Sequence, residues 1–241
     1  MAVTSVTEDQ QLKAPFLKLY AAGTGNGYKI LILLELLGID YYFKSINLLK
    51  GEQREPWFLA INGNGRIPSI VDVDDHGNKT ELNESIAILS YLAEKFDKDR
   101  KFSYDHNDPL YYKQLEWMLF QATTLAPPRG QMTLLMLDNR LGKAKTEQVD
   151  YVIEKYRTET VRCFELLEKQ LLKNGTGYLI GDHLSIVDVA VFPYIDFDFE
   201  PKLENELKEF KFLSQWANKI AALPEITRAK QIVETSPAYL F

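Results

Sequence analysis

The feature that most constrains this chain is a helix-forming segment, residues 26–37, that is apolar on nearly every side. It follows a β-prone segment, Phe16–Ala21, and a turn that contains Gly23, Gly25 and Gly27. A helix without a polar face must be covered on more than one side. The sequence therefore predicts that this helix is buried between two layers of structure.

The following residues extend this start into a small mixed sheet. Gly38 lies where a helix C-cap belongs, and β-prone residues 41–47 follow it, which completes a βαβ unit. After a polar stretch over Leu48–Asn64, three further segments are predicted: a strand over 67–73 that turns at 74–78, its hairpin partner over 79–82, and an amphipathic helix over 84–96. The order βαβ, loop, ββα fits a compact domain of about 80 residues.

Beyond a charged segment at 97–108 the pattern becomes helical. Residues 148–172 repeat apolar positions at helical spacing, which predicts a long helix with one covered side. Ser185 and Asp188 have the spacing of a capping box, and Leu184 is placed to staple onto Val189. We therefore expect an α+β chain that ends in an all-α domain. The predicted divisions are a flexible N-terminal arm over 1–15, a sheet domain over 16–97, a linker over 98–108 and a helical domain over 109–241.

Composition excludes several classes of function. The formal net charge is -6 and no basic run occurs, so a nucleic-acid partner is not expected. The longest apolar runs, Ile30–Leu34 and Val189–Phe192, are far shorter than the roughly 20 residues of a membrane span. No targeting signal is visible at the N-terminus, which makes a cytoplasmic location the expectation. With one cysteine, Cys163, and three histidines, neither a disulfide nor a metal site is expected.

The glycine-rich turn is the first candidate binding site, because backbone N–H groups at a helix N-terminus attract anions. Neither nucleotide-binding glycine motif is present. Two interpretations stay open: a tight turn capped by Asn26, or a site where Asn26 and Thr24 direct donors at a bound thiolate.

Two further motifs favour a ligand. Pro68 stands at the start of a predicted strand, where a cis proline would create a fixed backbone edge beside Ile67. Glu84 and Ser85 open a helix directly after a strand, so that together they could hold the ammonium and carboxylate groups of an amino acid. Taken singly, Ser85 is more often a helix cap and Glu84 a first-turn charge.

These motifs together resemble the glutathione transferase family over residues 16–232. The resemblance is carried by Asn64-Gly65-Arg66-Ile67-Pro68, by Glu84-Ser85-Ile86-Ala87-Ile88-Leu89, and by the Ser185 to Asp188 cap after Gly181-Asp182-His183-Leu184. Residues 24–29 and 51–56 are similar to the subgroup that contains the fungal nitrogen-regulation prion protein and the bacterial nu-class enzymes. The implied fold is a thioredoxin-like domain followed by a helical domain.

The resemblance also implies roles for single residues. Asn26, and with it Thr24, would face the sulfur of glutathione as catalytic residues. The residues implied to bind glutathione are Gln53, Arg66, Ile67, Glu84 and Ser85. The residues implied to form the pocket for a second substrate are Phe120, Gln121, Pro128, Arg129 and Met132. Two positions depart from the family pattern, because relatives usually have an apolar residue at Arg129 and a proline at Gly25.

The implied activity is that of a cytoplasmic glutathione transferase in detoxification, with glutathione, reduced or oxidised, as co-substrate and no metal. Its thiolate would be conjugated to an electrophile or would reduce a disulfide or a peroxide. The alternative is a catalytically weak glutathione-binding protein that regulates a protein partner. The family also implies a homodimer. Tyr20 is a rival activator of the thiol, and Cys163 is expected to be a buried, inert residue.

Overall fold

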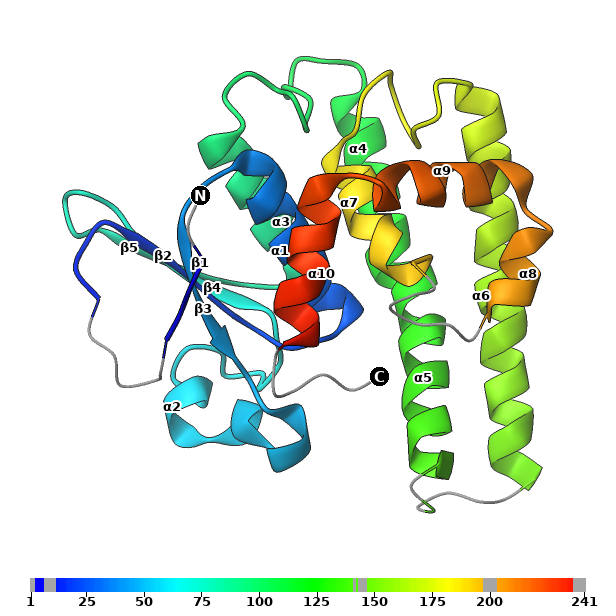
Figure 1. Ribbon diagram of the computed structural model, residues 1–241, viewed down its shortest axis with the longest axis horizontal. Helices are drawn as coiled ribbons and strands as arrows, with labels where there is room; N and C mark the ends of the chain where they lie inside the picture. The colour runs from blue at the N-terminus through cyan, green and yellow to red at the C-terminus, as the bar shows by residue number, and fades with distance from the viewer. Residues whose placement is uncertain (1–2, 7–11, 141, 143–146, 197–202, 236–241) are drawn as a thin grey trace. The chain divides into compact units, whose positions relative to one another are not determined.

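The computed structural model describes residues 3–6, 12–140, 142, 147–196 and 203–235 (Figure 1). The chain divides into two compact units, residues 1–101 with 221–241, and residues 102–220. From the sequence we expected the boundary near residue 97 and the whole C-terminal part in the helical domain. The return of the last residues to the first unit is the main difference.

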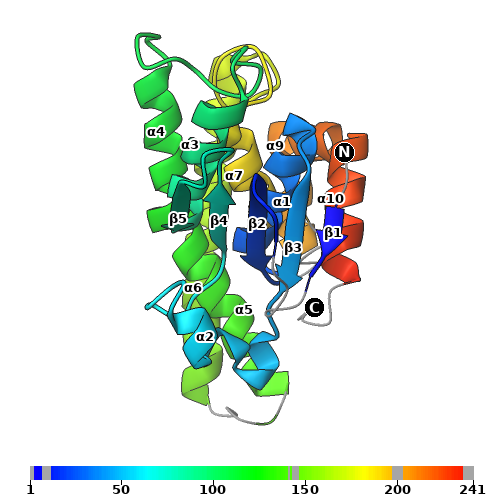
Figure 2. The same cartoon turned by 90° about the vertical axis from the view of Figure 1, so that its left-hand side faces the viewer.

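The first unit contains a five-stranded mixed sheet in the order β1-β3-β2-β4-β5 (Figure 2). Its strands are β1 (Val3–Ser5), β2 (Phe16–Ala21), β3 (Tyr41–Ser45), β4 (Ser69–Val73) and β5 (Lys79–Asn83). β3 runs parallel to β2, whereas β4 is antiparallel to β2 and to β5. The βαβ unit and the hairpin are therefore formed as predicted.

β1 was not predicted, because residues 1–15 were expected to form a flexible arm. Within that segment Val3–Ser5 pair in parallel with Tyr41–Phe43, and the Val6 N–H donates to the Phe43 carbonyl at 3.0 Å. A strand of three residues has no room for an alternating pattern, so its pairing depends on the β3 edge beside it. Residues 7–11 of the expected arm lie outside the described residues.

The apolar helix is α1 (Gly25–Leu37), and residues 30–34 have no exposed surface. It contacts α3 (Ser85–Phe96) and α10 (Pro224–Glu234). Its C-cap is Gly38, with φ 66°. The burial of this helix and its glycine cap confirm the prediction from the sequence.

α10 is attached to α1 by contacts that join residues far apart in the chain (Figure 1). The Arg228 Nε donates to Glu35 Oε2 at 2.9 Å, and the Tyr41 hydroxyl donates to the other oxygen of this buried carboxylate at 3.1 Å. The Tyr28 hydroxyl reaches the Ile226 carbonyl at 3.5 Å. Contacts between residues so far apart do not affect the local periodicity of the sequence. This is why α10 was expected in the helical domain and not in the first unit.

The face of the sheet that lies away from α1 is covered by residues 48–59, which belong to the expected polar stretch. This segment forms three short helices, two 3-10 turns at Leu48–Lys50 and Glu52–Arg54 and then α2 (Pro56–Leu59). A second core of Tyr20, Ile46, Phe58 and Val71 lies on this side of the sheet.

The second unit is helical, as predicted. Its helices are α4 (Tyr111–Phe120), α5 (Ala126–Arg140), α6 (Glu147–Asn174), α7 (Ile186–Val191), α8 (Glu204–Lys208) and α9 (Lys211–Ala221). A π-helical turn over Gln121–Leu125 joins α4 to α5, and a 3-10 turn over Phe192–Tyr194 follows α7. The long helices α5 and α6 pack side by side (Figure 1). No helix in the described part of the chain is long and apolar enough to cross a membrane.

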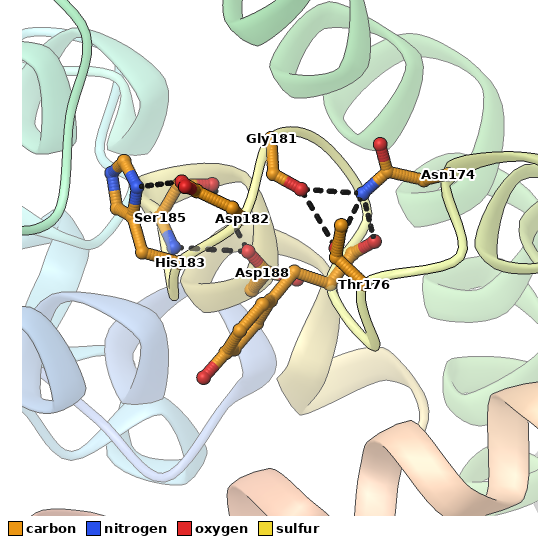
Figure 3. Close-up of polar contacts among 8 residues, drawn as sticks. Asn174, Thr176, Gly181, Asp182, His183, Ser185 and Asp188 are labelled. Atoms are coloured by element: carbon orange, nitrogen blue, oxygen red, sulfur yellow. Dashed lines mark hydrogen bonds and ion pairs between the residues drawn. The ribbon is translucent and has the colours of Figure 1, made fainter.

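The start of α7 confirms the predicted capping box (Figure 3). Asp188 is fully buried and its carboxylate accepts four hydrogen bonds, from Leu179 N, Ser185 N, Ser185 Oγ and Trp216 Nε1, at 2.8 to 3.0 Å. Burial raises the pKa of this carboxyl, and the donated bonds oppose that shift. This group therefore holds together the loop, the helix start and α9.

Candidate functional site

The first unit contains a cavity of about 390 Å³ where α1 and α3 begin. Its third side is the loop that leads into β4. The lining residues are Asn26, Asn62, Asn64, Arg66, Ile67, Pro68, Glu84 and Ser85. Two helix N-termini face the same space, and each adds a partial positive charge that favours an anion there.

Thr24, and not Asn26, is the N-cap of α1. The Thr24 Oγ1 accepts a hydrogen bond from the Gly27 N–H at 3.2 Å. The interpretation that Asn26 caps this turn is therefore wrong. Gly27 has no space for a side chain, because a Cβ there would collide with the Ala22 carbonyl oxygen. This close approach fixes the start of α1 against the end of β2.

Asn26 is joined to the start of α3. The Ser85 hydroxyl donates to Asn26 Oδ1 at 3.2 Å. With Oδ1 used as an acceptor, the amide group that Asn26 can direct at an anion is the donor Nδ2. This contact links the two helix starts, which lie 59 positions apart in the sequence.

Glu84 precedes α3 in a backbone conformation that is unusual for a residue with a side chain, at φ 64° and ψ 112°. Such a conformation costs about 1–3 kcal/mol and persists where the surrounding structure imposes it. The exposed Glu84 side chain lines the cavity. An acidic side chain held there under strain is consistent with a binding role.

The loop before β4 is organised by Asn62, which is 5% exposed. Its Nδ2 donates to the Arg66 carbonyl at 2.7 Å, and its Oδ1 accepts from the Asn64 N–H at 3.0 Å. The Ile67–Pro68 peptide bond is cis, which confirms the prediction. The loop thus places Arg66 and the Ile67 main chain on the cavity.

Of the seven residues implied to face or bind glutathione, five line this cavity: Asn26, Arg66, Ile67, Glu84 and Ser85. Thr24 caps α1 and Gln53 lies in the 3-10 turn, and neither lines the cavity. Sequence reasoning missed Asn62 and Asn64 as lining residues. The signal was available, because both belong to or adjoin the motif that ends at Pro68.

Lys29 lies one helical turn after Asn26 and has no exposed surface. Burial lowers the pKa of this ammonium group to about 7, and the nearby Glu84 carboxylate opposes the shift. Sequence reasoning also missed this residue, because one lysine within an apolar helix gives no pattern.

The rival activator Tyr20 and the thiol of Cys163 are both packed in apolar surroundings. Tyr20 contacts the rings of Trp57 and Phe58 at centroid distances of 6.3 and 6.1 Å, and burial with the charge of Glu81 raises its pKa to about 12. Burial likewise raises the pKa of the Cys163 thiol to about 11. Cys163 is fully buried, as predicted, and contacts the Thr124 carbonyl at 3.7 Å.

The second-substrate residues implied by the resemblance lie at the end of α4, in the π turn and in the first half of α5. Gln121, Pro128, Arg129 and Met132 are buried, whereas Phe120 is partly exposed. Their role stays a prediction. Among the described residues, no group of three or more His, Cys, Asp or Glu side chains could hold a metal ion.

Comparison with known proteins gives two family matches. The glutathione S-transferase N-terminal domain matches residues 26–95, and the glutathione S-transferase C-terminal domain matches residues 140–229. Among curated proteins, the disulfide-bond oxidoreductase YfcG of Escherichia coli is 33% identical over 88% of this chain and 93% of its own length. Glutathione S-transferase 1 of Schizosaccharomyces pombe is 32% identical over 83% of this chain and 88% of its own.

Solved structures agree with these matches. A glutathione transferase homologue from Lodderomyces elongisporus, with two glutathione molecules per subunit, has a TM-score of 0.79 and 36% identity. The alignment covers 92% of this chain and 99% of that one. The transferase URE2P8 from Phanerochaete chrysosporium, with oxidised glutathione, has a TM-score of 0.80 and 28% identity, over 93% and 97% of the two chains. Fold, motifs and identity thus lead to one conclusion: the chain belongs to the glutathione S-transferase family.

Proposed function

We propose that this chain binds glutathione in the cavity between the starts of α1 and α3 and uses its thiolate for chemistry. The observation that carries the proposal is the pairing of Asn26 with Ser85 at 3.2 Å, which brings two helix N-termini and an amide donor to one cavity. Relatives whose structures contain glutathione or its disulfide support the identity of the ligand.

The polarity of the cavity matches the charges of the tripeptide. Its γ-glutamyl end carries an ammonium and a carboxylate, for which Glu84 and the start of α3 with Ser85 are the partners. The main chain of Ile67 would pair with the cysteinyl backbone, and Arg66 would face the remaining carboxylate. The sulfur would then lie at the start of α1, beside Asn26.

The energetic task at the sulfur is modest. A free thiol has a pKa near 8.5, and lowering it by about 2 units requires roughly 2.7 kcal/mol of preferential thiolate stabilisation. A charge-assisted hydrogen bond of about 1.5–3 kcal/mol and a helix N-terminus worth about 0.3–1 kcal/mol supply that amount. The neutral amide of Asn26 therefore suffices as the activating group.

The thiolate supports two reactions. Attack on an electrophilic carbon forms an S–C bond and expels a leaving group, whereas attack on a disulfide forms a mixed disulfide and releases the other thiolate. The relative named as a disulfide-bond oxidoreductase makes the second reaction part of the proposal. Assays with a model electrophile and a model mixed disulfide distinguish the two.

The Asn26→Ala variant tests the proposal. We expect the pKa of the bound thiol, followed by ultraviolet absorbance of the thiolate, to rise by about 1–2 units, with turnover at neutral pH reduced about 10- to 100-fold. Binding of S-methylglutathione, which has no thiol proton, should change little. An unchanged pH–rate profile would reject Asn26 as the activating group, and binding without turnover by the wild type would favour a regulatory protein.

We also propose the homodimer that the resemblance implies. Light scattering of the purified chain across a dilution series tests it, and a monomer mass at every concentration would overturn it.

A further inference from the structure

Four Asn-Gly dipeptides occur in the chain: Asn26–Gly27, Asn62–Gly63, Asn64–Gly65 and Asn174–Gly175. In such a pair the glycine nitrogen can attack the asparagine Cγ, which closes a succinimide ring and releases ammonia. Water then opens the ring to aspartate or isoaspartate. The reaction needs no enzyme and no oxidant. It does need a side chain free to rotate, a glycine N–H able to leave its hydrogen bond, and access for water.

Two of the four Asn-Gly pairs lie in the first unit and are held by hydrogen bonds that oppose ring closure. Asn26–Gly27 lies in the first turn of α1, where the bond from Gly27 N to Thr24 Oγ1 holds the attacking nitrogen and the bond from the Ser85 hydroxyl to Asn26 Oδ1 holds the side chain. Asn62 is buried, and both ends of its amide are engaged in the loop before β4.

The third pair is fixed at the end of α6 (Figure 3). The Asn174 Nδ2 donates to Thr176 Oγ1 at 2.7 Å, to the Tyr178 carbonyl at 2.9 Å and to the Gly181 carbonyl at 2.8 Å. The Gly175 N–H in turn donates to the Leu171 carbonyl at 2.9 Å. Ring closure there would break four hydrogen bonds.

Asn64 differs from the other three. Its side chain is exposed and makes no hydrogen bond within the described residues. The attacking N–H, that of Gly65, is held only by one turn bond to the Asn62 carbonyl at 2.8 Å. Opening one turn hydrogen bond costs about 0.5–1.5 kcal/mol, which slows a reaction by about tenfold at most.

We propose that Asn64 is a site of spontaneous deamidation, and that its conversion places a carboxylate on the rim of the ligand cavity. Asn64 lines this cavity together with Arg66. A new negative charge there competes for the arginine and repels an anionic ligand. This second consequence rests on the proposed function, whereas the site of modification does not.

Ageing the intact wild-type protein at mildly alkaline pH tests the site. We expect an acidic form, one unit more negative than the formal -6, to separate on anion exchange. Tryptic peptide 55–66 contains both Asn62 and Asn64, and fragment-ion masses distinguish them. Asn64 should convert within about tenfold of its rate in the free synthetic peptide. The other three asparagines should each convert at least tenfold more slowly than Asn64. Equal rates at Asn62 and Asn64, or earlier conversion at Asn26 or Asn174, would overturn the proposal.

Two variants test the deamidation site and its effect on glutathione binding separately. Asn64→Gln, whose longer side chain closes a ring far more slowly, should abolish the acidic form. Asn64→Asp should weaken glutathione binding several-fold by calorimetry, as should the isolated aged form. Wild-type affinity in Asn64→Asp would overturn the charge effect. If fresh wild-type protein binds no glutathione, the proposed function fails, and the peptide map alone decides the modification site.

Discussion

The starts of α1 and α7 use the same kind of polar residue for opposite purposes. At α7 the capping box is completely buried, and each carboxylate oxygen of Asp188 accepts two hydrogen bonds from the protein. At α1 the cap is completed by Thr24, while Asn26 lies on a cavity. A polar group buried within the protein stabilises the fold, and a polar group that lines a cavity can also contact a ligand. The comparison predicts that substitutions at α7 change stability and substitutions around α1 change binding.

The largest expected effect is that of Asp188→Ala. The substitution leaves four buried donors without an acceptor, three in the loop and one in α9, which we expect to cost about 3–5 kcal/mol of unfolding free energy. Urea unfolding measures this loss. The glutathione affinity of the molecules that remain folded should stay at the wild-type value. A loss of affinity without a loss of stability would contradict the assignment of α7 to stability. Asp188→Asn, which retains one acceptor, should lose less.

The second prediction concerns Lys29, the buried lysine of α1. The pKa of Lys29 is about 7 in the folded protein, below its ordinary value of 10.5, so the unfolded chain binds more protons between these two pH values. Stability relative to Lys29→Met must therefore rise as the pH increases from about 7 to 10.5, by up to about 4 kcal/mol. Unfolding free energies of both proteins across this range test the sign. Parallel curves would show that burial does not penalise the charge.

Glu84→Gly should separate binding from stability at one position. Glycine adopts φ 64° without strain, so we expect a gain of about 1 kcal/mol in stability, partly offset by the entropy of the glycine in the unfolded chain. Affinity for glutathione should fall about tenfold, because the partner of its ammonium is lost. Glu84→Gln, which keeps the strained backbone, is the control and should lose affinity without the gain in stability.

The smallest effect is expected for Cys163→Ala. The thiol is buried in the second unit and its raised pKa keeps it protonated at neutral pH. Removing it should cost at most about 1 kcal/mol of stability through the small space that it leaves. Turnover with a model disulfide should be unchanged. Loss of that activity alone would assign thiol chemistry to the protein rather than to glutathione.

Much of the fold could be predicted because its helices and strands follow from local sequence patterns. The alternation of strands and helix up to Phe96 and the capping box at Ser185 each depend on residues close in the chain. β1 and α10 could not be predicted, since the first is a polar tripeptide and the second is attached through Glu35 and Arg228, 193 positions apart.

The candidate site shows the same limit. Motifs predicted Asn26, Arg66, Ile67, Glu84 and Ser85, and the cavity brings these residues together. The hydrogen bond between Asn26 and Ser85 required the structure, because it depends on how α1 and α3 pack. Gln53 was implied by the resemblance alone, and no local pattern indicated that it lies away from the cavity.

The attachment of α10 to α1 has a consequence for biosynthesis. The helix that covers part of α1 is synthesised only after all of residues 102–220. Until then the Glu35 carboxylate lacks its arginine, and part of the apolar surface of α1 has no cover. The nascent first unit should therefore bind chaperones until α10 has emerged, although its sheet was synthesised first.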